Sequence, residues 1–202
     1  MVGLMGGTFN PVHYGHLLMC ESIREEFNLN KIIFIPARIP PHKTKENIIS
    51  PEDRLRMVEL AIEDNPYFKL SDIEIRRSGP SYTVDTLKEF RKIYSFKELF
   101  LIVGADSLVQ FHTWRDYQQI FSLSKIIVAK RPDTDENLLN EHIDKFTNEM
   151  GAKILVSGHR AMDYSSTEIR ERIKKGASIR YRTPASVADY IYKRGLYRSD
   201  KD

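Results

Sequence analysis

The sequence predicts an α/β fold in which helices cover both faces of a parallel, doubly wound sheet. Short apolar runs rich in β-branched residues recur along the chain, and segments with helical periodicity separate them. A length of 202 residues suffices for one such domain with a proper core. We therefore expect a single domain over residues 1–202, in which residues from about 160 to 202 form a small C-terminal helical subdomain.

The predicted strands are short and apolar, as suits the buried strands of a parallel sheet. In chain order they are Val2–Met5, Lys31–Ile35, Phe68–Ile75, Leu99–Val103, Lys125–Ala129 and Ile154–Val156. A sheet of this Rossmann-like kind binds ligands at the carboxyl ends of its strands, near the point where the strand order reverses. The residues that follow each strand are therefore the first candidates for a site.

The predicted helices have capping residues at several of their ends. Proline suits the first helical position after a capping hydroxyl, as in Ser50-Pro51 and Thr183-Pro184, and Gly195 is placed to end the last helix. The helical segments are Gly15–Phe27, Pro51–Asp64, Thr83–Ile93, Asp106–Thr113, Glu136–Met150, Thr167–Lys174 and Pro184–Lys193.

Composition narrows the class of protein. Lysine and arginine number 31 against 28 acidic residues, and this net charge of +3 suits a small anionic ligand better than nucleic acid. One cysteine excludes an internal disulfide framework, and the sequence contains neither a signal-peptide pattern nor an apolar run of membrane-spanning length. We expect a cytoplasmic protein that binds neither nucleic acid nor a membrane. A homo-oligomer is left open.

The most informative segment is Gly6–His16, GGTFNPVHYGH, which follows the first predicted strand. Its paired glycines allow N–H groups to approach a phosphate closely. His13 and His16 lie three positions apart at a helix start, so both rings can donate to one polyphosphate. Zinc is the alternative ligand, but Cys20 lies on the apolar helix face and no third ligand has a familiar spacing. A third interpretation is a pair of polar groups that only cap the helix.

Other strand ends present residues of related chemistry. The second strand leads into a proline-stiffened loop that presents His42 and Lys43, either to an anion or simply to solvent. Gly104 and Asp106 follow the fourth strand. The carboxylate of Asp106 can accept hydrogen bonds from ribose hydroxyls, help to organise a metal or cap a helix. Arg131 follows the fifth strand and is a candidate phosphate contact.

Two helix starts and one aromatic residue complete the candidates. Ser81-Tyr82-Thr83 offers N–H groups to a carboxylate or phosphate, although capping alone explains these residues. Ser165-Ser166-Thr167 and Arg170 form a second phosphate cradle, because arginine can bind two oxygens at once; hydroxyls at a cap also occur without a ligand. Trp114 is either a core residue or a platform for a heteroaromatic ring.

Two of these segments resemble the signatures of the HxGH nucleotidyltransferases. His13-Tyr14-Gly15-His16 resembles the HxGH element, and Ser165–Arg170, SSTEIR, resembles the second signature. Within that superfamily, bacterial nicotinate-nucleotide adenylyltransferases are similar in three further segments, which are Pro40-Pro41-His42-Lys43, Ser81–Leu87, and Gly104-Ala105-Asp106 with Trp114-Arg115. The resemblance extends from residue 3 to about residue 192.

The resemblance implies an enzyme of NAD biosynthesis that transfers the adenylyl group of ATP to nicotinate mononucleotide and releases pyrophosphate. Direct attack on the α-phosphorus requires positioning and charge stabilisation rather than a protein nucleophile. Mg²⁺ would be carried by ATP phosphate oxygens and water, without dedicated protein ligands. The alternatives are another HxGH enzyme, such as phosphopantetheine adenylyltransferase, and a non-catalytic nucleotide-binding protein.

The resemblance also implies roles for individual residues. His16, His13 and Lys43 would be catalytic. The ATP site would comprise Gly6, Gly7, Thr8, Phe9, His13, His16, Gly104, Asp106, Ser165, Ser166, Thr167 and Arg170. Nicotinate mononucleotide would be bound by His42, Lys43, Tyr82, Thr83, Trp114 and Arg131.

Overall fold

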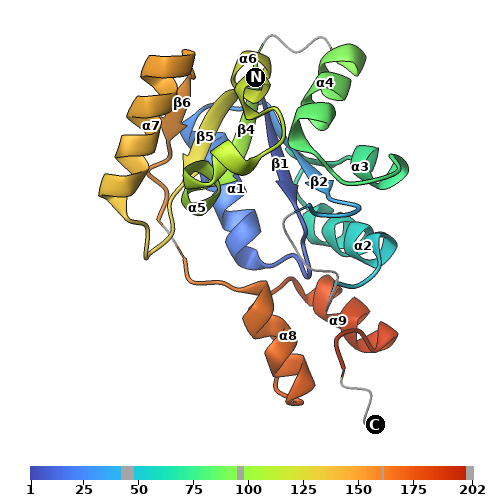
Figure 1. The fold of residues 1–202 in the computed structure, drawn as a ribbon. Helices are drawn as coiled ribbons and strands as arrows, with labels where there is room; N and C mark the ends of the chain where they lie inside the picture. Colours follow the sequence, from blue (N-terminus) through green and yellow to red (C-terminus); the bar gives the residue numbers. More distant parts are fainter. Residues whose placement is uncertain (42–47, 95–97, 161, 199–202) are drawn as a thin grey trace.

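The computed structural model describes residues 1–41, 48–94, 98–160 and 162–198, and it confirms the predicted α/β, Rossmann-like fold (Figure 1). Its parallel sheet has six strands in the order β3-β2-β1-β4-β5-β6. The strands are β1 (Val2–Gly7), β2 (Lys31–Pro36), β3 (Phe68–Leu70), β4 (Leu99–Gly104), β5 (Lys125–Ala129) and β6 (Ile154–Val156). The order reverses between β1 and β4, which marks the expected place for a ligand.

At this reversal, the strand register leaves the last residues of β1 and β4 unpaired with each other. β1 pairs with β2 along its whole length, from Val2 opposite Lys31 to Gly7 opposite Pro36. Its pairing with β4 ends at Leu4 and Leu101. The carboxyl ends of β1 and β4 are therefore not joined by the ladder, and backbone at the switch point is available to a ligand.

Helices cover both faces of the sheet, because neighbouring strand residues such as Leu101 and Ile102 point to opposite sides. One face is packed against α1 (Tyr14–Glu26), α2 (Pro51–Ile62), α8 (Ser166–Lys174) and α9 (Ala185–Arg194). Side chains on the other face pack against α3 (Ile73–Arg76), α4 (Thr83–Ile93), α5 (Ala105–Val109), the 3₁₀ turn Phe111–Thr113, α6 (Tyr117–Leu123) and α7 (Glu136–Met150).

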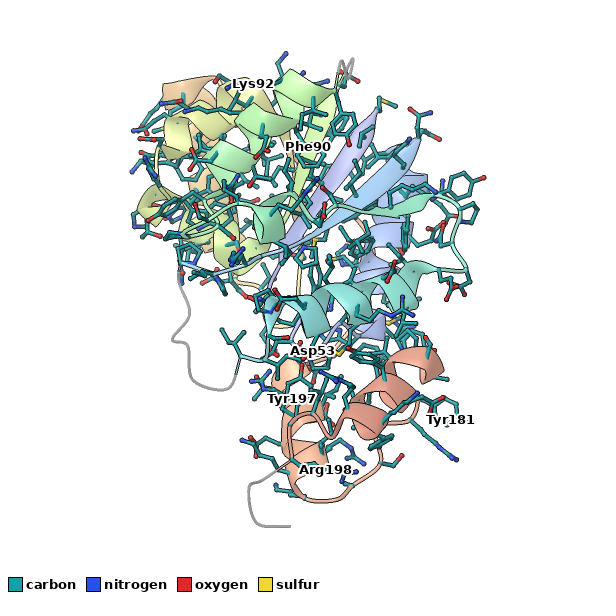
Figure 2. All side chains as sticks on the ribbon, turned by 90° about the vertical axis from the view of Figure 1, so that its right-hand side faces the viewer. Asp53, Phe90, Lys92, Tyr181, Tyr197 and Arg198 are labelled. Atoms are coloured by element: carbon teal, nitrogen blue, oxygen red, sulfur yellow. The ribbon has the colours of Figure 1, made fainter. Side chains whose placement is uncertain are left out.

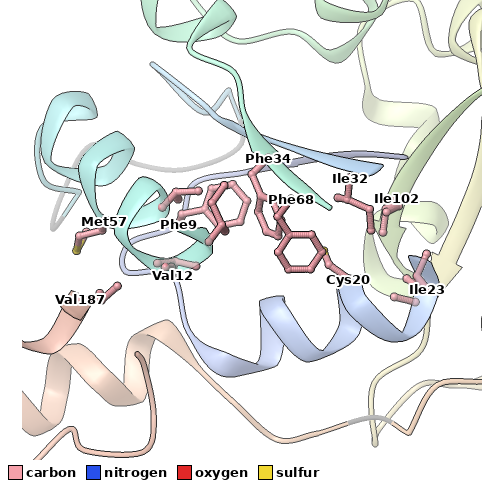
Figure 3. Close-up of a cluster of buried hydrophobic side chains, with 14 of the residues drawn as sticks. Phe9, Val12, Cys20, Ile23, Ile32, Phe34, Met57, Phe68, Ile102 and Val187 are labelled. Atoms are coloured by element: carbon pink, nitrogen blue, oxygen red, sulfur yellow. The ribbon is translucent and has the colours of Figure 1, made fainter. Parts of the chain in front are cut away.

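The first of these two cores joins the C-terminal helices to the sheet (Figure 3). The ring of Phe34 packs against Phe9 and Phe68 at centroid distances of 5.8 and 5.0 Å. Met57 of α2 and Val187 of α9 are fully buried in the same cluster. Because buried apolar area is the main source of stability, α9 is stabilised by packing on the sheet domain rather than by a core of its own.

The C-terminal helices lie beyond the carboxyl ends of the strands, and Figure 2 shows Tyr197 near Asp53 of α2. Tyr190 of α9 donates from its hydroxyl to Asp53 at 2.7 Å. Thr183 donates to the carbonyl oxygen of Val12 at 2.8 Å. These bonds connect the C-terminal part to the loop that follows β1 and to the start of α2.

Some predicted elements need correction. Phe68–Ile75 is not one strand, because β3 ends at Leu70 and the buried Ile73 and Ile75 belong to the short helix α3. Asp106–Thr113 is divided into α5 and a 3₁₀ turn, and α6 was not predicted. Thr183 does not cap α9, since its hydroxyl is bonded to Val12.

Other expectations are confirmed. The Ser50 hydroxyl accepts from the Asp53 N–H at 3.0 Å at the start of α2, and Gly195 ends α9 with φ of +63°. Within the described ranges, no helix is both long enough and apolar enough to cross a membrane.

Candidate active site

A cavity of about 1290 Å³ lies at the carboxyl edge of the sheet. It brings together every predicted site residue within the described ranges: Gly6, Gly7, Thr8, Phe9, His13, His16, Tyr82, Thr83, Gly104, Asp106, Trp114, Arg131, Ser165, Ser166, Thr167 and Arg170. His42 and Lys43 lie outside the described residues, whereas Pro40 and Pro41 line the cavity. The ends of five strands (β1, β2, β4, β5 and β6) and the starts of three helices (α1, α4 and α8) thus contribute to one site.

Glycines have two different roles around this cavity. A Cβ added at Gly6 or Gly104 would meet no protein atom within 4 Å, so packing does not require glycine there and the backbone is open to a ligand. At Gly15 a Cβ would lie 2.7 Å from the Cβ of Tyr164 and 3.1 Å from Nδ1 of His13. The glycine between the two histidines therefore lets the segment before α8 rest directly on the start of α1.

The two histidine rings are stacked, with centroids 3.7 Å apart. The backbone N–H of His13 donates to Nδ1 of His16 at 3.3 Å at the start of α1. Because Nδ1 of His16 accepts this bond, we assign the proton of the neutral ring to Nε2. His16 is thereby set up as a hydrogen-bond donor.

His13 is the more buried of the pair, with 6% of its surface exposed, and its Nδ1 has no hydrogen-bond partner among the described residues. Burial, followed by the positive charge of Arg131, lowers the pKa of His13 to about 4. The ring is therefore neutral near pH 7, and a phosphate arriving beside it would favour protonation.

We expect the ligand-free protein to lose stability as the pH falls from 6.5 to about 4. Over this range the unfolded chain binds a proton on His13 that the folded protein does not bind, so the free energy of unfolding falls with pH, by roughly 3 kcal/mol in full. Urea unfolding at pH 7 and pH 4.5 measures this loss. His13→Asn should lack this part of the pH dependence and the exposed-site control His112→Asn should retain it; equal pH dependence in both variants would contradict the assignment.

The second predicted cradle is hydrogen-bonded directly to the first loop. Ser166 at the start of α8 donates to the carbonyl oxygen of Pro11 at 2.8 Å. Arg170 donates from Nη1 to the carbonyl oxygen of Asn10 at 2.8 Å and from Nη2 to Oγ1 of Thr167 at 3.1 Å. Ser165 caps α8 through a 3.4 Å bond from the Glu168 N–H. The two cradles form one continuous hydrogen-bonded wall.

Asn10 is the central connection of this wall. Its carbonyl oxygen accepts from Arg170, while its Oδ1 accepts from the hydroxyl of Tyr197 at 2.9 Å and from the N–H of Ile49 at 3.4 Å. Asn10 and Tyr197 are both largely buried, and burial raises the pKa of the Tyr197 hydroxyl, which keeps it protonated as a donor. The chain beyond α9 therefore takes part in shaping the loop after β1.

The start of α4 forms another part of the cavity, with Tyr82 as its N-cap residue. The Tyr82 N–H donates to the carbonyl oxygen of Pro80 at 3.1 Å. Arg115 lies over the Tyr82 ring, with Cζ 4.8 Å from the centroid, and its Nη1 is 3.7 Å from a carboxylate oxygen of Asp85. The sequence analysis gave Arg115 no role, although its place beside Trp114 was a usable signal.

Trp114 packs on the second core, as one of its two predicted alternatives requires, and the ligand platform stays a prediction. Its ring packs on Phe111 with a centroid distance of 4.5 Å, at the edge of the second core, and the residue also lines the cavity. A ring held in this way is a firm platform for a flat ligand.

Asp106 does not cap α5, because Gly104 occupies the N-cap position. Its carboxylate lies 3.4 Å from Nη1 of Arg131, and both side chains are mostly exposed. No cluster of three or more histidine, cysteine or acidic side chains that could hold a metal occurs in the described part of the chain. Cys20 is buried in the first core.

The residues directly after β6 were not among the predicted site residues. His159 and Arg160 follow this strand and line the cavity. His159 donates from its N–H to Oγ of Ser157 at 3.2 Å, and Ser157 donates in turn to the carboxylate of Glu26 at the end of α1. The rule that ligands gather at strand ends applied here as well, and it would have identified both residues.

Comparisons with known proteins show the family of this chain. The sequence model of the cytidylyltransferase-like family matches residues 4–172. A probable nicotinate-nucleotide adenylyltransferase of Desulfitobacterium hafniense (strain Y51) is 48% identical, over 98% of this chain and 95% of its own. A protein of the same name from Thermoanaerobacter sp. (strain X514) is 42% identical, and the match covers 100% of this chain and 96% of that protein.

A solved structure of the Plasmodium falciparum nicotinic acid mononucleotide adenylyltransferase, complexed with NaAD, has a similar fold. The TM-score is 0.79 at 20% sequence identity, over 97% of this chain and 96% of that chain.

Fold, cavity and family match together define a nucleotidyltransferase of the cytidylyltransferase-like class. Within this class the chain belongs to the nicotinate-nucleotide adenylyltransferase family, as the resemblance of its signatures predicted.

Proposed function

We infer that the protein transfers the adenylyl group of ATP to nicotinate mononucleotide, giving nicotinate adenine dinucleotide and pyrophosphate in NAD biosynthesis. Identity of 48% over nearly the full length of a family member carries this inference. The cavity volume of about 1290 Å³ is in keeping with two nucleotide substrates, since sites for one small molecule usually measure roughly 300–1000 Å³.

On the ATP side, we propose that the phosphates lie between the loop Gly6–Phe9 and the first turn of α8. Support comes from the hydrogen bonds of Ser166 to Pro11 and of Arg170 to Asn10, because they fix the first turn of α8 against the chain directly after that loop. The donor Nε2 of His16 would bind the phosphate oxygens that gain charge as the bond to pyrophosphate breaks. His13, Ser165 and Thr167 would complete this side.

On the acceptor side, Tyr82, Thr83 and Trp114 would bind the nicotinate group, and His42, Lys43 and Arg131 its phosphate. The position of Trp114 between the second core and the cavity supports the stacking role. Gly104 and Asp106 would bind the ribose or adenosine of ATP, supported by the open space above Gly104. Attack by the acceptor phosphate on the α-phosphorus then needs only alignment of the two substrates.

We propose that Mg²⁺ enters the site bound to ATP. The carboxylates of Asp106, Asp133 and Asp163 around the cavity are separate rather than clustered, and this fits an ion held mainly by phosphate oxygens and water. Its chemistry would be to neutralise charge on the phosphates.

We further propose that residues 1–202 form one nucleotidyltransferase domain and that the protein is cytoplasmic. The core shared by α1, α2, α8 and α9 supports a single domain. A lone, buried cysteine supports a reducing compartment.

Pyrophosphate release from ATP and Mg²⁺ tests the function when three acceptors are compared in parallel. We expect the highest kcat/KM with nicotinate mononucleotide, less with nicotinamide mononucleotide, and no release with phosphopantetheine. Release with phosphopantetheine alone would overturn the acceptor, and no release with any of the three would overturn the enzymatic function.

A further inference from the structure

Arg54 on α2 is fully buried, and its guanidinium binds three backbone carbonyl oxygens. Nη1 donates to Thr8 at 2.8 Å, Nη2 to Arg38 at 3.1 Å and Nε to Ile49 at 3.2 Å. The neighbouring carboxylate of Asp53 accepts from the hydroxyls of Tyr190 and Ser50 instead. One cation therefore connects three separate segments of backbone.

Stability alone does not account for an arginine at this position. Burying a charge is costly, and an apolar side chain of similar volume usually serves a core as well or better. A guanidinium, however, offers donors in a fixed planar fork, which can hold several carbonyl groups in a defined arrangement. The arrangement of the three segments is thus the feature that requires Arg54.

The bond to Thr8 determines the direction of the next amide group. In a trans peptide the C=O and N–H point in opposite directions, so the N–H of Phe9 points away from Arg54. Phe9 adopts φ of +48°, which is unfavourable for a residue with a side chain, and its ring is buried while the residue lines the cavity. The Phe9 amide is thus directed away from Arg54, in a residue that lines the cavity.

The other two bonds act on the acceptor side. Arg38 follows β2, and Ile49 precedes α2. These carbonyl groups therefore lie before and after the stretch of sequence that contains His42 and Lys43. The same guanidinium fixes both positions relative to Thr8 in the ATP loop.

We propose that Arg54 is a positioning residue for adenylyl transfer. It aims the Phe9 amide at an ATP phosphate and sets the spacing between the ATP loop and the backbone at Arg38 and Ile49. The proposal rests on the function inferred above for this cavity, and Arg54 acts without touching either substrate.

Arg54→Lys tests this role, since it keeps the charge but loses the planar fork. We expect the dissociation constant for Mg·ATP, measured by calorimetry without acceptor, to rise about tenfold and kcat to fall about tenfold or more. The control is Arg56→Lys on the same helix, where the arginine is half-exposed and paired with Glu59. Its binding and turnover should match those of the wild type.

The Phe9 amide gives a readout that a merely structural role would not change. In ¹⁵N-phenylalanine-labelled protein, the Phe9 resonance is identified by its loss in Phe9→Tyr. We expect this resonance to shift on addition of Mg·ATP to the wild type, and to shift less in Arg54→Lys. The wild-type measurement requires no arginine variant to fold.

Two results would overturn the proposal. One is a wild-type Phe9 resonance that does not respond to ATP. The other is a folded Arg54→Lys protein with a lowered Tm but unchanged ATP affinity and kcat. If the wild type binds ATP with the expected shift and Arg54→Lys shows a smaller one, but no acceptor gives pyrophosphate release, the proposed function fails while the orienting role of Arg54 stands.

Discussion

Replacement of His16 by alanine should lower kcat by roughly two or more orders of magnitude while the fold stays intact. The ring is held by its stacking on His13 and by the bond that its Nδ1 accepts, so its Nε2 proton is in place before substrate arrives. A donor that is already oriented stabilises the developing charge on pyrophosphate without further reorganisation. Alanine removes this donor and leaves only solvent to replace it.

The measurement is steady-state pyrophosphate release, with circular dichroism and Tm to establish folding. The hydrogen bond from the His13 N–H at the start of α1 is also lost, at a cost of about 1 kcal/mol in stability, so a small decrease in Tm is expected. His112→Ala is the matched control, because His112 is exposed and its Nδ1 is bonded to the carbonyl oxygen of Val109. Near-normal turnover in folded His16→Ala would remove this residue from the catalytic role.

Much of the site was predictable because each of its parts depends on local sequence. The alternation of short apolar runs and helical segments predicts a parallel sheet, and the order of segments places Gly6, Gly104 and Arg131 at strand ends. The start of α8 is predicted by its hydroxyl residues. Residues far apart in sequence meet at one edge because the sheet itself brings them together.

Arg54 shows where this reasoning fails. In the sequence it is one of two arginines near the start of a charged helix, and nothing local distinguishes it from the half-exposed Arg56. Its burial depends on the carbonyl oxygen of Thr8, 46 positions earlier, and on that of Arg38, 16 positions earlier. Such contacts are set by tertiary packing, which periodicity and propensity do not report.

The same limit explains the error at Phe68–Ile75. Apolar and polar residues alternate over most of this segment, FKLSDIEI, and such alternation favours a half-buried strand, although Phe68, Ile73 and Ile75 are buried in two different elements. Ser71 ends the pairing, since its N–H donates to the carbonyl oxygen of Phe34 just beyond the last residue of β3. The chain then turns into α3, whose Ile73 packs in the second core.

Arg170→Met should lower kcat by about two orders of magnitude and raise the KM for ATP. The bonds of Arg170 to Asn10 and Thr167 hold its charge between the loop after β1 and the first turn of α8, where the leaving pyrophosphate is proposed to lie. Arg170→Lys should recover part of the loss, because lysine restores the charge but not the planar fork that binds two groups at once. Arg172→Met is the control, since Arg172 donates to the carbonyl oxygen of Ser178 instead. Equal kcat values for Arg170→Met and Arg172→Met, with both proteins folded, would show that pyrophosphate leaves without help from this guanidinium.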